Sequence, residues 1–340
     1  MKQRIYYLDV IRCLACLMVV FMHAPYPNSG MSGVFVVPIS LATAPCIGLF
    51  FMVSGALLLP TKDSGISFVK KRLAKVACPM LVWTLVAMII KGFINGWPST
   101  FDLVKCLFSM PFHVEGHGVM WFMYVLVGMY LVAPVISPWL ERAEKKELLF
   151  YLGIWAITMS YPILKLFLRV DETDTGVLYY FSGYIGYFLL GYYLRKYGAG
   201  KTRFALVYLP VPFVLLGICK YLSYDVDFYS VFWYLSILIA LMCWSWFTII
   251  KNAEQRIAAL CPKVLSVVTH FSNCSFGIYL MHIFVMCNGI WPIFDKFGIG
   301  GGISLAVSFG GTLLISYSLT WIISLLPFGE YIIGYKKKRK

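Results

Sequence analysis

The chain has 340 residues, of which 60% are hydrophobic and 13% charged, with a net charge of +14 and a mean hydropathy of +0.79. A soluble domain of this composition would have too little polar surface to cover itself, so soluble globular proteins are excluded. Nucleic-acid binding is excluded by the charge distribution: all but six of the 29 lysines and arginines lie at the termini, in the first apolar stretch or in alternate connections.

The apolar residues fall into ten stretches, most of them close to the roughly 20 residues that a membrane-spanning helix needs. The stretches cover residues 6–24, 34–59, 74–96, 119–138, 148–168, 178–194, 204–222, 229–250, 270–292 and 303–327. The basic connections predict that both termini are cytoplasmic, and an even number of spans agrees. We therefore predict an all-α polytopic membrane protein, a bundle of about ten transmembrane helices. Residues 1–335 would form its transmembrane domain and 336–340 a basic cytoplasmic tail.

The first predicted span carries three ionisable residues, Asp9, Arg12 and His23. A charge inside a span costs about 2.5–3.5 kcal/mol on insertion, so such residues indicate function by default. Asp9 and Arg12 are three residues apart and are expected to pair on one helix face. Arg12 and His23 are eleven apart, about three turns, so they share a face. The alternative without chemistry has Arg12 reaching the inner headgroups and His23 lying in the outer interface.

Other residues leave two interpretations open. Cys13 and Cys16 form a C-x-x-C pair, but no second thiol pair completes a metal site, so we expect no metal and interpret them as small apolar residues. Ser275, Tyr279 and His282 share one face of the ninth span, either as site residues or as interhelical polar contacts. Some members of a tyrosine-rich segment could stack on a sugar ring, although most are expected to serve packing. That segment contains Tyr179, Tyr180, Tyr184, Tyr187, Tyr192 and Tyr193.

Five motifs follow one another along the chain. They are Leu8-Asp9 with Arg12 and His23; Gly48-Leu49-Phe50-Phe51-Met52-Val53-Ser54-Gly55; Lys71-Arg72 with Lys75 and Pro79; Trp121-Phe122 with Tyr130-Leu131 and Pro134; and Ser275-Phe276-Gly277-Ile278-Tyr279-Leu280-Met281-His282. Together they resemble the acyltransferase 3 family, the membrane O-acyltransferases that modify bacterial surface glycans.

The chain departs from the family pattern at two positions. Lys75 stands where the family usually has arginine, which keeps the charge but loses the bidentate fork. Val119 stands where many members have histidine, with His113 and His117 nearby, so any role of that family histidine is in doubt here.

The resemblance implies a bacterial cytoplasmic (inner) membrane protein that moves an acetyl group from cytoplasmic acetyl-CoA to a hydroxyl of an extracytoplasmic or lipid-linked glycan. Its expected partners are acyl-CoA, the sugar acceptor and membrane lipids, with no nucleic acid and no metal; a homo-oligomer is left open. Transfer of another acyl group such as succinyl, and transport or flipping of a glycan or small metabolite without chemistry, remain alternatives.

Residue roles follow from the same resemblance and from the chemistry of the side chains. Basic groups should bind the coenzyme phosphates; these are Arg12, Lys71, Arg72 and Lys75. His23 is expected to be the general base, with an acyl-imidazole as a variant, and Tyr279 to bond the acyl carbonyl or orient His23. The catalytic set is thus His23, Arg12 and Tyr279. The substrate-binding or supporting set is Asp9, Ser54, Trp121, Ser275 and His282, of which Ser54 is expected to pack helices and not to act as a nucleophile.

Overall fold

The computed structural model describes residues 4–97, 99–109, 120–168, 178, 181–224 and 226–337. Every regular element within these residues is a helix, so the all-α prediction is confirmed. Eight helical segments of the described chain are long and apolar enough to cross a membrane. They are Tyr6–His23, Gly33–Leu58, Gly65–Ile94, Trp121–Arg142, Lys145–Lys165, Thr202–Tyr221, Pro262–Phe297 and Gly301–Ser324. The protein is therefore a multi-pass membrane protein.

The helices are, in chain order, α1 (Tyr6–His23), α2 (Gly33–Thr43), α3 (Pro45–Leu58), α4 (Gly65–Asn95), α5 (Thr100–Ser109), α6 (Trp121–Arg142), α7 (Lys145–Leu168), α8 (Ile185–Tyr197), α9 (Thr202–Tyr208), α10 (Val211–Tyr221), α11 (Phe228–Val231), α12 (Ile237–Asn252), α13 (Glu254–Ala258), α14 (Pro262–Val285), a π-helical turn (Met286–Ile290), α15 (Trp291–Phe297), α16 (Gly301–Ser324) and α17 (Gly329–Ile333). Val119, His113 and His117 lie outside the described residues.

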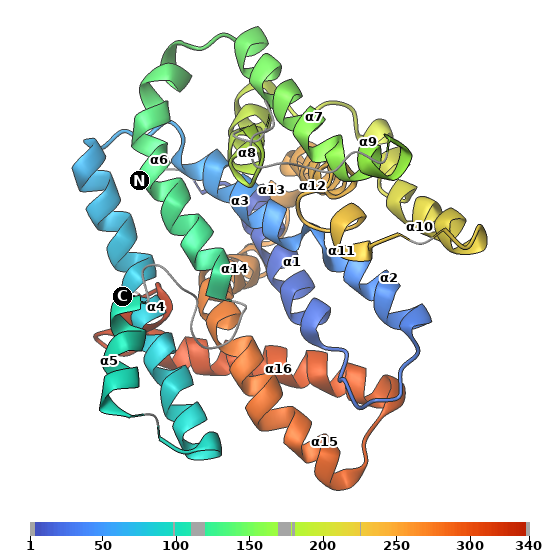
Figure 1. The fold of residues 1–340 in the computed structure, drawn as a ribbon. Coiled ribbons are helices and arrows are strands. Elements are labelled where there is room, and N and C mark those ends of the chain that lie inside the picture. Colours follow the sequence, from blue (N-terminus) through green and yellow to red (C-terminus); the bar gives the residue numbers. More distant parts are fainter. Residues whose placement is uncertain are drawn as a thin grey trace.

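Helix α1 lies near the centre of the bundle and packs against α3 and α14 (Figure 1). Small and β-branched residues such as Ala15 and Val19 are fully or almost fully buried along it, so its neighbours approach closely. The thiols of Cys13 and Cys16 donate to backbone carbonyls of α14, at Val268 and Ser275. These contacts agree with the interpretation of the two cysteines as small packing residues.

Glycines bring α3 and α8 into backbone contact. A Cβ atom at Gly55 would lie 1.8 Å from the carbonyl oxygen of Phe188, and one at Gly191 would lie 1.9 Å from that of Met52. Neither position has room for any side chain. In the Ser54-Gly55 end of the second motif, Gly55 is thus the residue that allows the two helices to pack closely.

Helix α16 contacts α14 through small hydroxyl residues at every fourth position. These residues are fully buried: Ser304, Ser308, Thr312, Ser316, Thr320 and Ser324. Small side chains let two membrane helices approach closely where lipid provides no hydrophobic driving force. Residues four apart are neighbours on a helix surface, so these side chains form a continuous buried stripe along α16.

Two of the ten predicted spans are only partly helical. Helix α8 has 13 residues and α12 has 16, which at 1.5 Å per residue gives about 20 and 24 Å, short of a hydrocarbon core of about 30 Å. Before α8, Gly183 has φ +94° and the helix begins at Ile185. Before α12, the short helix α11 ends at Val231 and a turn follows. Apolarity alone predicted full spans, because nonhelical segments buried in protein can be equally apolar.

The bundle has two chemically different ends. At one, which we call the basic end, Lys251 of α12 donates to the backbone carbonyl of Arg195 at the end of α8. At the opposite end, the hydroxyl of Tyr26, just after α1, donates to Asp295 of α15, and this bond raises the pKa of Tyr26. His23 closes α1 at this opposite end.

Candidate active site

A cavity of about 260 Å³ opens between α1, α3, α4, α6 and α14, and we call it the arginine cavity. Three cations line it, Arg12, Arg72 and Lys75, together with hydroxyl groups from α3, α6, α14 and the segment after α17. Its full lining is Arg12, Phe50, Ser54, Arg72, Lys75, Val76, Phe122, Leu126, Tyr130, Ser272, Asn273, Ser275, Phe276, Tyr279, Gly334 and Tyr335. Positive charge in a partly enclosed, low-dielectric site attracts anions strongly.

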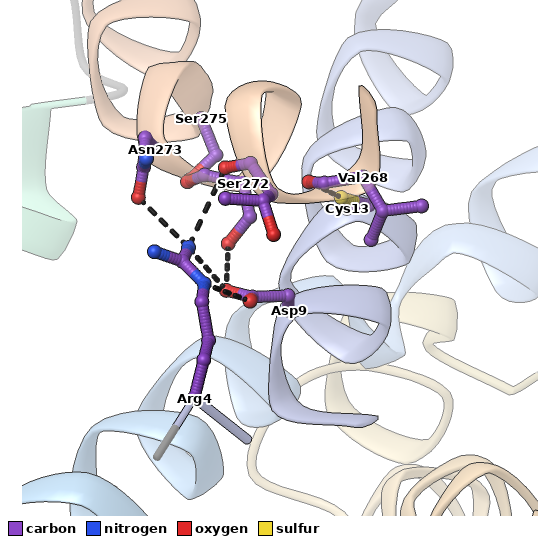
Figure 2. Close-up of polar contacts among 8 residues, drawn as sticks. Arg4, Asp9, Cys13, Val268, Ser272, Asn273 and Ser275 are labelled. Carbon is purple, nitrogen blue, oxygen red and sulfur yellow. Dashed lines mark hydrogen bonds and ion pairs between the residues drawn. The ribbon is translucent and has the colours of Figure 1, made fainter. Parts of the chain in front are cut away.

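Asp9 does not pair with Arg12 as the spacing suggested. Its carboxylate accepts two hydrogen bonds from Arg4, at 2.6 Å to Nε and 3.0 Å to Nη2, and a third from the hydroxyl of Ser272 at 2.7 Å (Figure 2). Arg4 lies two residues before the start of α1. Ile5, between them, is extended, so the Arg4 side chain folds back over the first turn of the helix. A local extended segment can thus outcompete a partner three residues along the helix.

Arg12 is left facing the arginine cavity. Among the residues that the structure describes, its guanidinium makes no hydrogen bond or ion pair, although it is largely enclosed. A guanidinium has five donors that match the oxygens of carboxylates and phosphates. A charged group kept unpaired at this depth points to an anionic ligand.

Two of the three predicted basic residues of α4 reach the cavity. Arg72 and Lys75 line it, and the guanidinium of Arg72 lies 5.7 Å from the ring centre of Phe68. Lys71 does not line it, because its amine pairs with Asp63 at 3.1 Å on the exposed surface. Consecutive residues on a helix point about 100° apart, which separates Lys71 from Arg72.

Two serines predicted as supports, and Tyr279 of the predicted catalytic set, also line the cavity. Ser54 contributes from α3, and Ser275 and Tyr279 contribute from α14. The hydroxyl of Ser275 donates to the carbonyl oxygen of Ser272 at 2.8 Å. The shared face predicted for the ninth span is therefore present, with two of its three members at the cavity.

His282 and His23 continue inward from Tyr279 as a row of rings. The ring centres of Tyr279 and His282 are 5.7 Å apart, and those of His282 and His23 are 5.1 Å apart. His282 is fully buried, whereas His23 is partly accessible. His23 does not line the arginine cavity itself. It lies beyond Tyr279, on the side toward the end of the bundle opposite the basic end.

The hydrogen bond of His23 fixes its protonation pattern. Its Nδ1 lies 2.9 Å from the carbonyl oxygen of Val19, which can only accept, so Nδ1 carries the proton. In the neutral ring, Nε2 then holds the lone pair. An imidazole with this tautomer is arranged to accept a proton at Nε2.

Comparison with known proteins identifies the family of the chain. The family model of the acyltransferase 3 family, described as an acyltransferase domain, matches residues 5–323. The chain belongs to the acyltransferase 3 family. It is thus a membrane acyltransferase, which takes an acyl donor and an acceptor.

This acyltransferase is also similar to the "Putative membrane-bound acyltransferase YfiQ" of Bacillus subtilis (strain 168). The two are 21% identical over 375 aligned positions, which cover 97% of this chain and 95% of the Bacillus protein. No solved structure gave a significant match.

A second cavity of the acyltransferase, about 710 Å³, opens at the basic end, and we call it the wide cavity. Arg72 lines both cavities, so they adjoin at that side chain. The charged residues that line the wide cavity are Lys62, Asp63, Arg72, Glu141, Arg195 and Lys196. Four cations against two anions leave a positive balance.

Trp121 lies on the far side of the arginine cavity. Its neighbour Phe122 lines that cavity, while the Trp121 ring packs against Tyr184 and Tyr234 at 5.4 and 5.5 Å. The first turn of α6 therefore forms part of the wall of the arginine cavity. Trp121 packs within this wall and does not line the arginine cavity.

Sequence reasoning missed several residues of the site. Tyr130 and Asn273 line the arginine cavity, and Arg195 lines the wide one. Tyr130 stood inside a quoted motif without an assigned role. Arg4 was counted only for its charge, and no helical spacing links a residue before a helix to one in its first turn.

Proposed function

We propose that this acyltransferase moves an acetyl group from cytoplasmic acetyl-CoA to a hydroxyl of an extracytoplasmic or lipid-linked glycan, in the cytoplasmic membrane of a bacterium. The observation that carries the proposal is the enclosed, unpaired guanidinium of Arg12 in a cavity shared with Arg72 and Lys75. An acyl-CoA carries several phosphate charges, and a donor site for it should be basic. The predicted cytoplasmic orientation of the basic end matches the compartment in which the coenzyme is made.

The two adjoining cavities suit the two halves of the coenzyme. The wide cavity, with its positive balance, is open enough for the charged nucleotide half. The arginine cavity is smaller, and its three cations suit the diphosphate that joins the nucleotide to the pantetheine arm, with the arm and its thioester running on toward Tyr279. In this assignment Arg72, which lines both cavities, binds at the junction, with Arg12 and Lys75 beside the diphosphate.

Catalysis in this proposal begins with His23. Its Nε2 accepts the proton of the acceptor hydroxyl, whose oxygen attacks the thioester carbonyl carbon. Tyr279, at the cavity wall, donates a hydrogen bond to the carbonyl oxygen as negative charge develops there. The carbon–sulfur bond then breaks, the thiol leaves with the proton that His23 held, and an ester remains on the acceptor.

The remaining residues position this machinery. Asp9 anchors the start of α1 to α14 through Ser272, which sets the register between Arg12 and Tyr279. His282 lies between Tyr279 and His23, with its Nδ1 donating to the carbonyl oxygen of Tyr279 at 2.5 Å. Ser54 and Ser275 add hydroxyl groups at the cavity wall.

Labelled donor tests the proposal. Inverted membrane vesicles containing the chain should transfer label from [¹⁴C]acetyl-CoA to the glycan fraction, and His23→Ala should abolish this while the protein level persists. Faster transfer from succinyl-CoA than from acetyl-CoA would identify succinyl, and not acetyl, as the group that the enzyme transfers. Passage of glycan across the membrane with no labelled ester would favour a transporter.

A further inference from the structure

A third cavity, about 290 Å³, lies away from the basic residues, and we call it the aromatic pocket. It is formed by the second half of α7, the segment just before α8, and the segment from α11 to the start of α12. Helix α7 contacts both α8 and α11 (Figure 1). The second half of α7 runs away from the basic end, which places the pocket toward the same end as His23.

The backbone around this pocket is what shortens two predicted spans. The segments before α8 and α12 fall within ranges that apolarity assigned to the membrane, yet residues 182–184 and 232–236 are not helical. Nonhelical backbone at membrane depth is tolerated only where it is buried in protein or lines a cavity. Both interrupted segments line the same pocket, which meets this condition.

Side chains hold both segments in place. The indole nitrogen of Trp155 donates to the carbonyl oxygen of Gly183 at 2.9 Å. Asp227 accepts from the backbone nitrogen of Tyr229 and from the hydroxyl of Ser230. The pocket is therefore preorganised.

The chemistry of the pocket differs from that of the arginine cavity. Among the described residues that line it, none is charged, and the most prominent are Tyr161, Tyr184, Tyr229, Trp233, Tyr234 and Ser230. Aromatic rings stack on the C–H face of a sugar, while tyrosine and serine hydroxyls pair with its hydroxyls. A phosphorylated coenzyme would find no countercharge on these residues.

The pocket also lies next to the reacting groups. The Tyr234 hydroxyl contacts the sulfur of Met22 at 3.2 Å, and Met22 precedes His23. Trp121 packs on Tyr184 and Tyr234 of the pocket, while its neighbour Phe122 lines the arginine cavity. One turn of α6 thus separates the two cavities.

We propose that the aromatic pocket binds a neutral sugar residue of the acceptor, stacked on Trp233, and presents its hydroxyl toward His23. The assignment rests on the proposed function for its place in the reaction. The binding of the sugar itself does not depend on which acyl group is transferred.

Binding of simple glycosides tests the assignment. The full chain in lipid nanodiscs, free of sugar detergents, is examined by saturation-transfer NMR with methyl glycosides of glucose, galactose, mannose and rhamnose, and with the anionic methyl glucuronoside. Acetyl-CoA binding is measured on the same samples. At least one neutral glycoside should bind, and Trp233→Ala should weaken that binding roughly tenfold or more, as removal of an aromatic anchor does. Trp233→Phe, which keeps a ring, should restore part of it.

Trp139→Ala is the matched control, because Trp139 bonds Glu147 near the other end of the bundle; it should bind glycoside as the natural chain does. All variants should keep their acetyl-CoA affinity, which also shows that they fold. The assignment is overturned if no neutral glycoside binds, if Trp233→Ala binds equally well, or if the glucuronoside binds as tightly as the glucoside. Glycoside binding without any acetyl-CoA binding would support the pocket and overturn the proposed donor.

Discussion

Asp9 holds Arg4 through both carboxylate oxygens, and Arg4 in turn reaches Asn273 of α14 at 3.0 Å. The N-terminal segment, α1 and α14 are thus tied together at the basic end. The tie removes the expected partner of Arg12 and leaves that cation to the cavity.

A double-mutant cycle measures this tie. Arg4→Gln and Asp9→Asn should each lower Tm, and the double variant should lower it by less than the two effects together, because each change removes the same ion pair. The Arg4 side chain is 38% exposed, so we expect a coupling of only about 0.5–1 kcal/mol. Arg12→Gln combined with Asp9→Asn is the comparison, and its coupling should be smaller, because no hydrogen bond or ion pair joins Arg12 to Asp9. Additivity for Arg4 and coupling for Arg12 would contradict the observed pairing.

Arg12→Met should raise stability and lower donor binding together. The guanidinium is enclosed without a protein partner among the described residues, so its removal relieves up to about 2–3 kcal/mol of desolvation. Tm in nanodiscs should therefore rise, while acetyl-CoA binding weakens. A fall in Tm would show that the guanidinium has a structural partner instead.

Two neighbouring lysines separate donor binding from general surface charge. Lys75→Ala should weaken acetyl-CoA binding roughly tenfold to a hundredfold, the loss expected for a charge-assisted hydrogen bond of about 1.5–3 kcal/mol. Lys71→Ala should weaken binding far less, because Lys71 lines neither cavity and touches the site only through its pair with Asp63. Equal losses at both positions would mean that only the summed surface charge matters. Titration with labelled acetyl-CoA decides between the two results.

Histidine replacement separates chemistry from binding. His23→Ala should reduce acetyl transfer by about 10²–10⁴-fold, the usual contribution of a general base, with acetyl-CoA affinity retained. His270→Ala is the matched control, because His270 bonds Tyr317 at 2.8 Å away from the row of rings. Initial rates of label transfer to glycan provide the measurement. Full activity in His23→Ala would exclude this residue as the base.

Gly55 is expected to tolerate no side chain. A Cβ there would overlap the carbonyl oxygen of Phe188 at 1.8 Å, so Gly55→Ala should cost at least about 1–3 kcal/mol through overpacking. At Gly128 of α6 a Cβ would meet nothing within 4 Å, and Gly128→Ala should be neutral or slightly stabilising. Folded yield after detergent extraction and Tm compare the two. A normal yield for Gly55→Ala would show that α3 and α8 can move apart at little cost in folding free energy.

The sequence predicted most of the architecture because apolarity and charge bias act over whole helices. It did not predict that α8 and α12 begin late, since Gly183 and the turn after Val231 lie in stretches that are as apolar as helices. Their interruption depends on packing around the aromatic pocket. Hydropathy contains no information about that packing.

The candidate site was predicted in part. Motif residues such as Arg12, Arg72 and Tyr279 meet at one cavity although they come from three helices. The pairing of Asp9 was missed because it comes from an extended segment, where helical spacing does not apply. Lys71 was grouped with Arg72 by charge, yet the helix turns it toward the surface.

The glycine contacts between α3 and α8 limit how the enzyme can move. With Gly55 against Phe188 and Gly191 against Met52, the two helices cannot slide past each other without backbone collision. Admitting a bulky donor must therefore be left to other walls of the arginine cavity. One of these walls is the long helix α4, which the bond from the Trp83 indole to the carbonyl oxygen of Ile332 joins to α17. Movement of α4 would carry Arg72 and Lys75 with it, so entry of the donor and its binding by these two cations would occur in one motion.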